Sequence, residues 1–254
     1  MLAGGVDVKE HITIVKVCLL AGKIMLKSGA ETSRVEDTMN RIAAAYDLEN
    51  VQSYATPTAI NFSIGVATET NFLRINNRST DLHKIAVVNH ISRQITAGEL
   101  DAREALRTIK HIDDKKLHFP GWVQIIAAAF VSGSFAYMFG GTWPDVLPAF
   151  IAGAAGFAGM IACDRLVDIR FVSEFLGGFI IGILAVAFLH YGFGASLDRV
   201  IIGAVMPMVP GVPITNAVRD LMAGHLVAGL SKGVEAGLTA FAIGAGIALV
   251  FGLV

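Results

Sequence analysis

Charged residues are scarce in this chain of 254 residues: Asp, Glu, Lys and Arg together make up 16% of it, whereas 54% of the residues are hydrophobic. Because a soluble domain usually carries about 25% charged residues, the composition excludes a wholly soluble protein and a disordered chain. Cysteine is also scarce, and the two cysteines suggest neither a disulfide scaffold nor a metal site. The formal net charge of −1 provides no basic surface for nucleic acid.

The short motifs of several enzyme classes are absent as well. The sequence has no GxxxxGK[ST] loop for nucleotide phosphates, which argues against an ATP-driven pump in this chain, and no HExxH, GxSxG or paired CxxC motif. His83 and His90 lie seven residues apart in one predicted helix, but they lack a third ligand. We therefore expect no enzymatic activity, no metal site and no cofactor.

What charge there is lies mostly in the first half of the chain. Residues 1–118 hold 15 of the 20 Lys and Arg residues, and residues 119–254 hold 21 of the 27 glycines. The second half contains five runs without Asp, Glu, Lys or Arg, and about 20 helical residues suffice to cross a membrane. The predicted spans are Gly121–Phe139, Val146–Cys163, Phe175–Leu197, Val200–Val218 and Ala236–Val254.

Residues 1–118 carry the patterns of a small α+β domain. Apolar stripes at helical spacing and alternating apolar residues predict helices over 10–28, 33–46, 81–97 and 99–112, and strands over 51–55, 58–66 and 72–76. Ser33 and Glu36 have the spacing of a capping box for the second helix. We predict an α+β cytoplasmic domain over residues 1–118, followed by an all-α membrane domain of five transmembrane helices over residues 119–254.

The positions of the cations predict the orientation, because cytoplasmic loops of membrane proteins are rich in Lys and Arg. Lys110, Lys115 and Lys116 precede the first predicted span, whereas the loop Gly140–Asp145 that follows it has no cation. Charges also interrupt the first apolar run of the chain, so no signal peptide is expected. Five spans then place the N-terminal domain in the cytoplasm and Val254 outside the cytoplasmic (inner) membrane.

Three prolines, Pro207, Pro210 and Pro213, recur at intervals of three residues late in the fourth predicted span. Each proline removes a backbone donor and clashes with the preceding turn, so a continuous helix cannot pass through this segment. Irregular backbone at membrane depth is tolerated only against protein or a water-filled cavity, and broken helices form the substrate sites of many secondary transporters. We therefore predict a fourth span that is broken at the prolines.

A polar face follows the prolines. Thr215 can cap a new helix in which Asn216, Arg219 and Asp220 share one face, and an arginine is a natural partner for a substrate carboxylate. The predicted substrate site consists of Pro207, Pro210, Gly211, Pro213, Asn216, Arg219 and Asp220. The alternative is a proline-rich cytoplasmic turn before a surface helix, with Arg219 acting only as a topology signal.

Two acidic residues near the spans are candidates for binding a coupling ion or proton. Glu235 begins the last predicted span, and Asp164 ends the second. Ionisable groups at helix ends or inside a bundle can bind coupling protons or ions. For Asp164, local pairing with Arg165 is the simpler explanation.

Two stretches of the sequence resemble the threonine/serine exporter family. The first is LKSGAETSRVEDTMNRIAAAYDL at Leu26–Leu48, and the second is VPGVPITNAVRDLMAGHLVAGLSKGVEA, which begins at Val209. Members of the family are membrane proteins with a cytoplasmic N-terminal domain; some export threonine and serine, and split forms are linked to the export of dicarboxylates such as succinate. The resemblance implies importance for four residues of the first stretch without assigning them a role, and a helix-capping turn explains them equally well. These residues are Gly29, Glu31, Ser33 and Arg34.

The resemblance also implies a partner. Fused members carry a second membrane block after the part that resembles this sequence, which suggests the larger subunit of a split exporter with a separate small membrane subunit. Gly178 and Gly182 in the third span would allow close helix packing, including packing in a homo-oligomer. We therefore expect a lipid-embedded subunit of a secondary transporter that exports small carboxylate-bearing metabolites, either threonine and serine or dicarboxylates such as succinate.

Two other functions remain open from the sequence. One is a membrane-tethered enzyme, with its chemistry on the polar strand face of Asn61, Ser63 and Arg74. The other is a regulatory scaffold for a partner channel. A span broken by proline would have no purpose in a simple membrane anchor, which weighs against both.

Overall fold

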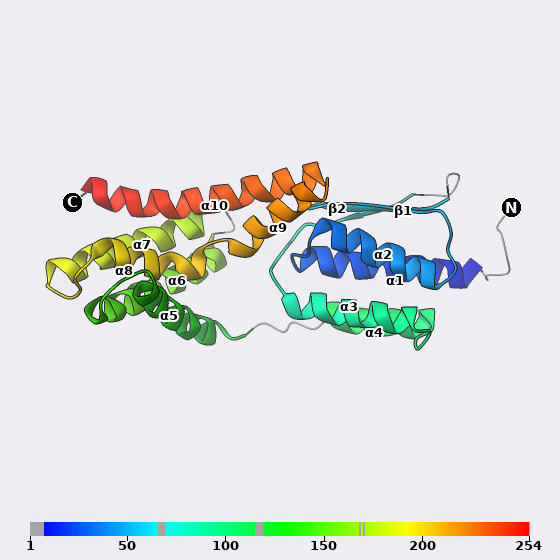
Figure 1. The fold of residues 1–254 in the computed structure, drawn as a ribbon, viewed down its shortest axis with the longest axis horizontal. Coiled ribbons are helices and arrows are strands. Elements are labelled where there is room, and N and C mark those ends of the chain that lie inside the picture. Colours follow the sequence, from blue (N-terminus) through cyan, green and yellow to red (C-terminus); the bar gives the residue numbers. More distant parts are fainter. Residues whose placement is uncertain (1–7, 66–69, 115–118, 168, 170, 254) are drawn as a thin grey trace. The chain divides into compact units, whose positions relative to one another are not determined.

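The computed structural model describes residues 8–65, 70–114, 119–167, 169 and 171–253 (Figure 1). Its contacts divide the chain into two compact units. The first unit comprises Met1–Leu117 and Val212–Gly233, and the second comprises His118–Gly211 and Val234–Val254. The predicted domain boundary between residues 118 and 119 stays a prediction, and Lys115 and Lys116, which support the predicted orientation, lie outside the described residues.

The first unit combines helices with a small sheet near the N-terminus, as the sequence predicts. Its strands form an antiparallel sheet in the order β1-β2-β3, in which Ala55 pairs with Ile60 and Asn61 pairs with Phe72. Its elements are α1 (Val8–Lys27), α2 (Thr32–Ala45), β1 (Val51–Thr56), β2 (Ala59–Ile64), β3 (Asn71–Arg74), α3 (Leu82–Thr96) and α4 (Ala102–Asp114), together with most of α9 (Gly211–Met222) and the start of α10 (Leu226–Leu253).

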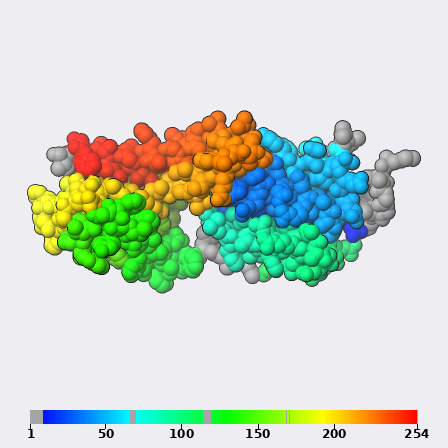
Figure 2. All heavy atoms as spheres, in the orientation of Figure 1, coloured from blue at the N-terminus to red at the C-terminus, as the bar shows by residue number. Residues whose placement is uncertain are grey.

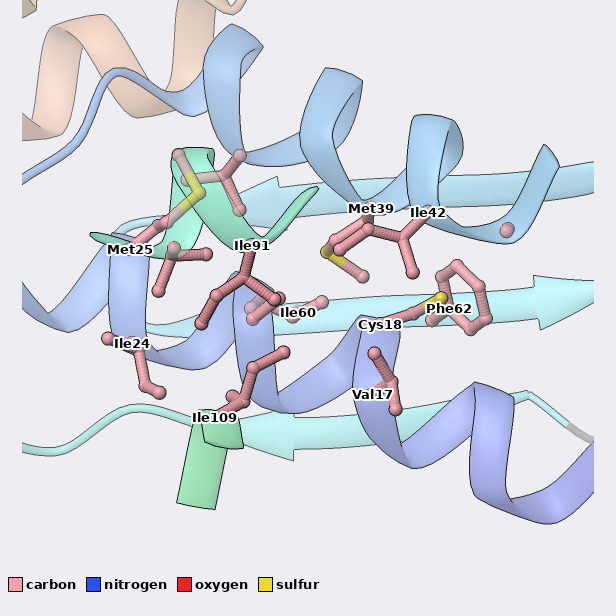
Figure 3. Packing of buried hydrophobic residues seen from close by; sticks show 14 of the residues in the cluster. Val17, Cys18, Ile24, Met25, Met39, Ile42, Ile60, Phe62, Ile91 and Ile109 are labelled. Carbon is pink, nitrogen blue, oxygen red and sulfur yellow. The ribbon is translucent and has the colours of Figure 1, made fainter. Parts of the chain in front are cut away.

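The core of this unit forms around the apolar face of β2. Ile60 and Phe62 are fully buried, whereas Asn61 and Ser63 on the other face of the strand are partly exposed. Phe62 lies beside Cys18 of α1 (Figure 3). Residues from the helices α1, α2, α3 and α4 complete the cluster. Burying an isoleucine or phenylalanine side chain contributes about 1.5–3 kcal/mol, so this face fixes the sheet to the helices.

The second unit contains the apolar helices. Its elements are α5 (Gly121–Met138), α6 (Trp143–Leu166), α7 (Val172–His190), α8 (Leu197–Val205), the 3₁₀ helix η1 (Met206–Met208) and the rest of α10. Within the described residues, four helices are long and apolar enough to cross a membrane: α5, α6, α7 and α10. The segment of α8, η1 and α9 adds a fifth if it is one broken span. The structure thus has four to five membrane-capable helices, while the count of five and the break at the prolines stay predictions.

Glycines allow α10 to pack closely on α7. A Cβ atom at Gly246 would overlap the backbone carbonyl of Phe175, and one at Gly178 would overlap the carbonyl of Ile243. Small residues have this role in membrane proteins because no hydrophobic effect drives helices together in lipid.

The predicted capping box of α2 is wrong. The helix begins at Thr32, with Glu31 in the N-cap position, so Ser33 already lies inside the helix. The Glu36 carboxylate accepts a hydrogen bond of 2.7 Å from the backbone N–H of Ala55 on β1 instead. A tertiary partner therefore replaces the local one that the spacing suggested.

The predicted start of α9 is also wrong. The helix begins at Gly211, so Thr215 lies within it, and its hydroxyl donates to the carbonyl of Val212 at 3.0 Å. Pro213 fits into the first turn because the N–H groups there have no acceptor within the helix. The prolines therefore lie at the beginning of this helix, which starts at Gly211 and not at Asn216, the residue after the predicted cap.

Candidate functional site

Two segments that are distant in the sequence meet inside the first unit: the turn between α1 and α2, and helix α9. Gly29 ends α1 in a left-handed conformation with φ of 84°, which glycine adopts at no steric cost. Its carbonyl accepts a hydrogen bond of 2.7 Å from the side-chain amide of Asn216, and Arg219 forms an ion pair with Glu31. Figure 2 shows atoms of the orange segment, which includes α9, against the blue segment of α2.

Asp220 attaches α9 to the first turn of α2. Its carboxylate is fully buried and accepts hydrogen bonds of 2.8 Å from both the backbone N–H and the hydroxyl of Thr32. Negative charge is favourable at a helix N-terminus, where backbone N–H groups lack partners. The N-cap residue Glu31 makes no capping hydrogen bond with its side chain, and Asp220 accepts from the N–H group of the first helical residue from a distant part of the chain.

Lys232, at the start of α10, provides the counter-ion for Asp220. Its ammonium lies 2.7 Å from the Asp220 carboxylate and also donates to the Ala30 carbonyl at 3.1 Å and to the Thr32 hydroxyl at 3.2 Å. The lysine is 9% exposed, so the pair is buried with its hydrogen-bonding groups occupied. Sequence reasoning missed this residue as part of a site, although a lysine in a largely apolar helix is a signal for a buried partner.

A cavity of about 660 Å³ lies beside these contacts, between the α1–α2 turn, α3 and α9. Three arginines line it: Arg34, Arg93 and Arg219. Among the described residues of its wall, Glu31 is the single acid, and its carboxylate contacts Arg219 and lies 4.0 Å from Arg34. The volume is typical of small-molecule sites, and the excess of positive charge suits an anionic ligand.

Of the four residues to which the family resemblance points, three line the cavity and one does not. Gly29, Glu31 and Arg34 line the cavity together with Asn216 and Arg219, whereas Ser33 is partly exposed on α2 and is not among the described wall residues. The resemblance therefore identified three wall residues of this cavity, and the motif that follows the prolines identified two more.

The remaining predicted site residues lie elsewhere. Pro207, Pro210 and Gly211 belong to the second unit, and Pro213 lies in the first turn of α9. The proposed coupling residues also belong to the second unit: Asp164 is exposed beside a cavity of about 320 Å³, and Glu235 is partly exposed in α10. The polar strand face is formed as expected, since Asn61 and Ser63 alternate with the buried residues of β2, and Arg74 pairs with Ala59.

Glu36 lies close to His225, in the turn between α9 and α10. The Glu36 carboxylate is 3.8 Å from Nδ1 of His225. Burial raises the pKa of Glu36 above its ordinary value, and the hydrogen bond from Ala55 and the charge of His225 oppose this effect in part. This carboxyl is therefore more readily protonated than an exposed glutamate.

Comparison with known proteins identifies the family. The model of the threonine/serine exporter family matches residues 16–254. The chain belongs to the threonine/serine exporter family. It is thus a membrane protein of a transporter family, which is not a family of enzymes, and the family expected from the two motifs is confirmed.

Three relatives show how the match is distributed. A protein of Klebsiella aerogenes named "Probable succinate transporter subunit YjjP" is 23% identical over 253 residues, which cover 96% of this chain and 95% of that protein. The "Probable threonine/serine exporter" of Mycobacterium tuberculosis is 24% identical over 91% of this chain, and the "Threonine/serine exporter" of Corynebacterium glutamicum is 23% identical over 96% of it. The matches cover 44% and 52% of those two proteins, so this chain spans about half of their length. No solved structure matches the chain.

Proposed function

We propose that this chain is a subunit of a secondary transporter that exports small carboxylate-bearing metabolites across the cytoplasmic membrane, and that it binds their carboxylate in the arginine-lined cavity. The observation that carries the proposal is the set of three arginines, Arg34, Arg93 and Arg219, that line one cavity. A guanidinium group binds a carboxylate through two parallel hydrogen bonds, which gives both affinity and orientation. Arg219 is well placed for this because its side chain is 64% exposed.

Charge favours a dicarboxylate such as succinate over threonine or serine. Three arginines and one glutamate leave an excess of two positive charges on the described wall of the cavity. A dianion neutralises this excess, whereas a zwitterionic amino acid does not. The relative of matching length from Klebsiella aerogenes carries succinate in its name, which agrees with this choice.

The predicted substrate site narrows under this proposal. Asn216 and Arg219 bind the substrate, whereas Asp220 holds them in position by fixing α9 to the start of α2. Pro207, Pro210, Gly211 and Pro213 shape the start of α9. Glu235 and Asp164 remain our candidates for binding the coupling ion or proton.

A second, small membrane subunit completes the transporter in this proposal. The support is the word "subunit" in the names of the relatives from Klebsiella aerogenes and Escherichia coli, to which this chain aligns over at least 94% of their length. We further propose that the N-terminal domain lies in the cytoplasm, where it meets the metabolites to be exported.

Substitution of Arg219 tests the proposed function. Cells that lack other members of the family would express the chain together with its membrane partner, and succinate and threonine efflux would be measured alongside the membrane abundance of the chain. Arg219→Lys keeps the charge but loses the two-pronged geometry, so we expect the apparent substrate constant to rise by about tenfold to a hundredfold. Arg219→Ala should abolish efflux at normal abundance.

Two controls accompany this experiment. Arg103 is an exposed arginine of α4 outside the cavity wall, so Arg103→Ala should leave efflux unchanged. Cells that express the chain without its partner should show no efflux. Normal efflux in Arg219→Ala would refute the carboxylate site and leave Arg219 as a topology signal.

A further inference from the structure

We infer that Glu31 is an internal competitor for the carboxylate site: its side chain holds Arg219 until the carboxylate of the substrate replaces it. Glu31 thereby determines which ligands bind, since a ligand must interact with the arginines more favourably than this glutamate does. The inference rests on the proposed function, because it concerns the same cavity.

The position of Glu31 in its helix is unusual for a glutamate. N-cap positions favour Ser, Thr, Asp and Asn, whose short side chains reach back to the first N–H groups of the helix. Glu31 stands at the N-cap of α2 without such a hydrogen bond, and the N–H group of the first helical residue, Thr32, donates to Asp220. The Glu31 side chain forms an ion pair with Arg219 instead.

The ion pair between Glu31 and Arg219 is suited to exchange. The Arg219 side chain is 64% exposed, whereas the Glu31 side chain is 17% exposed, so an incoming ligand can reach the guanidinium from the solvent side. Ion pairs that solvent reaches contribute little to stability, and solvent reaches this pair from the Arg219 side, so replacement of one carboxylate by another costs the fold little. Arg34, whose guanidinium lies 4.0 Å from Glu31, would be released by the same movement.

Arg93 of α3 lines the same cavity as the two arginines that Glu31 contacts, and the described lining holds no acid besides Glu31. A dicarboxylate that displaces Glu31 therefore has Arg219 or Arg34 available for one carboxylate and Arg93 for the other. A monocarboxylate replaces one carboxylate with another and gains no second ion pair. Glu31 thus lowers the apparent affinity for every carboxylate by the same factor, and the second ion pair favours dicarboxylates over monocarboxylates.

The expected effect follows from competition. If Glu31 occupies Arg219 in about nine molecules out of ten, the apparent affinity of a ligand is reduced about tenfold, because one molecule in ten is competent to bind. Removing the negative charge in Glu31→Gln should therefore tighten succinate binding by about tenfold. Glu31→Asp keeps the charge but is one methylene shorter, so it should tighten binding as well, although less.

The experiment measures equilibrium binding of radiolabelled succinate and threonine to the purified full chain in detergent. The variants are Glu31→Gln, Glu31→Asp and Arg219→Ala, and the control is Asp37→Asn, which removes an exposed acid of the same helix outside the cavity wall. We expect tighter succinate binding in both Glu31 variants, lost binding in Arg219→Ala and unchanged binding in Asp37→Asn. Thermal unfolding of each variant verifies that the chain is folded.

Failure of the inference and failure of the proposed function give different results. If succinate binds the wild-type chain and Arg219→Ala abolishes binding, but neither Glu31 variant binds more tightly, the proposed site stands and the competitor role is overturned. If Glu31→Gln weakens threonine binding, Glu31 is an acceptor for the ligand ammonium, which also overturns the competitor role. If neither ligand binds the wild type or any variant, the proposed function itself is refuted.

Discussion

The carboxylate of Asp220 has no contact with solvent and is stabilised by three hydrogen bonds, two from Thr32 and one from Lys232. Removing a carboxylate from water is costly unless an opposite charge and hydrogen-bond donors replace the water. Lys232 has the same requirement, because it is nearly as deeply buried. Each charge is therefore acceptable in the interior only in the presence of the other.

Loss of one member of this pair should destabilise the first unit strongly. We expect Asp220→Ala to lower the free energy of unfolding by about 3–5 kcal/mol, since it leaves the Lys232 ammonium buried without a counter-ion. The double variant Asp220→Ala/Lys232→Met should recover part of the loss, because no unpaired charge remains. Chemical unfolding of the purified chain measures both effects, and Asp37→Ala on the surface should stay within about 0.5 kcal/mol of the wild type. A single variant as stable as this control would show that the pair does not support the fold.

Arg219 and Asp220 show how far the sequence predicts the role of a residue. Their spacing after the prolines indicated one polar site, but successive residues of a helix point about 100° apart. Arg219 consequently faces the cavity, while Asp220 faces the α1–α2 turn. The different roles of the two residues depend on which segment packs against α9. That segment, at Thr32, is 188 residues away in the sequence, so no local pattern indicates it.

The sequence predicts the elements that have a strong periodic pattern, but it predicts the ends of those elements less accurately. The buried face of β2 and the long apolar helices α5, α6, α7 and α10 agree with the alternation and the charge-free runs of the sequence. The run at Val200–Val218 was different, since it contains parts of α8 and α9 with η1 between them. Apolar composition measures the length of a run, but it does not show that α9 packs with the N-terminal helices.

Because α7 and α10 approach closely, we expect alanine substitution to have different effects on stability at two glycines of α10. Gly246→Ala introduces a methyl group where the carbonyl of Phe175 lies, so we expect a loss of stability of about 1–3 kcal/mol. Gly244→Ala is the matched control, because a Cβ atom there meets no described atom within 4 Å. Thermal unfolding in detergent compares the two. Equal stability of both variants would contradict close packing at Gly246.

The number of spans decides on which side of the membrane the chain ends. Four spanning helices would return Val254 to the side of the N-terminal domain, and five would place it on the opposite side. We expect five, so a reporter that is active only outside the cytoplasm should be active when fused after Val254 and silent when fused after Lys116. Silence at both positions would indicate four spans, with α8 and α9 not crossing the membrane as one broken helix. Activity after Lys116 would reverse the proposed orientation.

The hydrogen bonds between Thr32 and Asp220 can form only late in biosynthesis, after α9 has been translated. A ribosome adds about 5–20 residues per second, so the 188 residues between these partners correspond to roughly 10–40 s of translation. During this interval α2 has emerged without the carboxylate that caps it, and helices α5 to α8 are synthesised before α9. The wall of the cavity is therefore assembled late, and under the proposed function a nascent N-terminal domain cannot bind metabolite before helices α5 to α8 have been made.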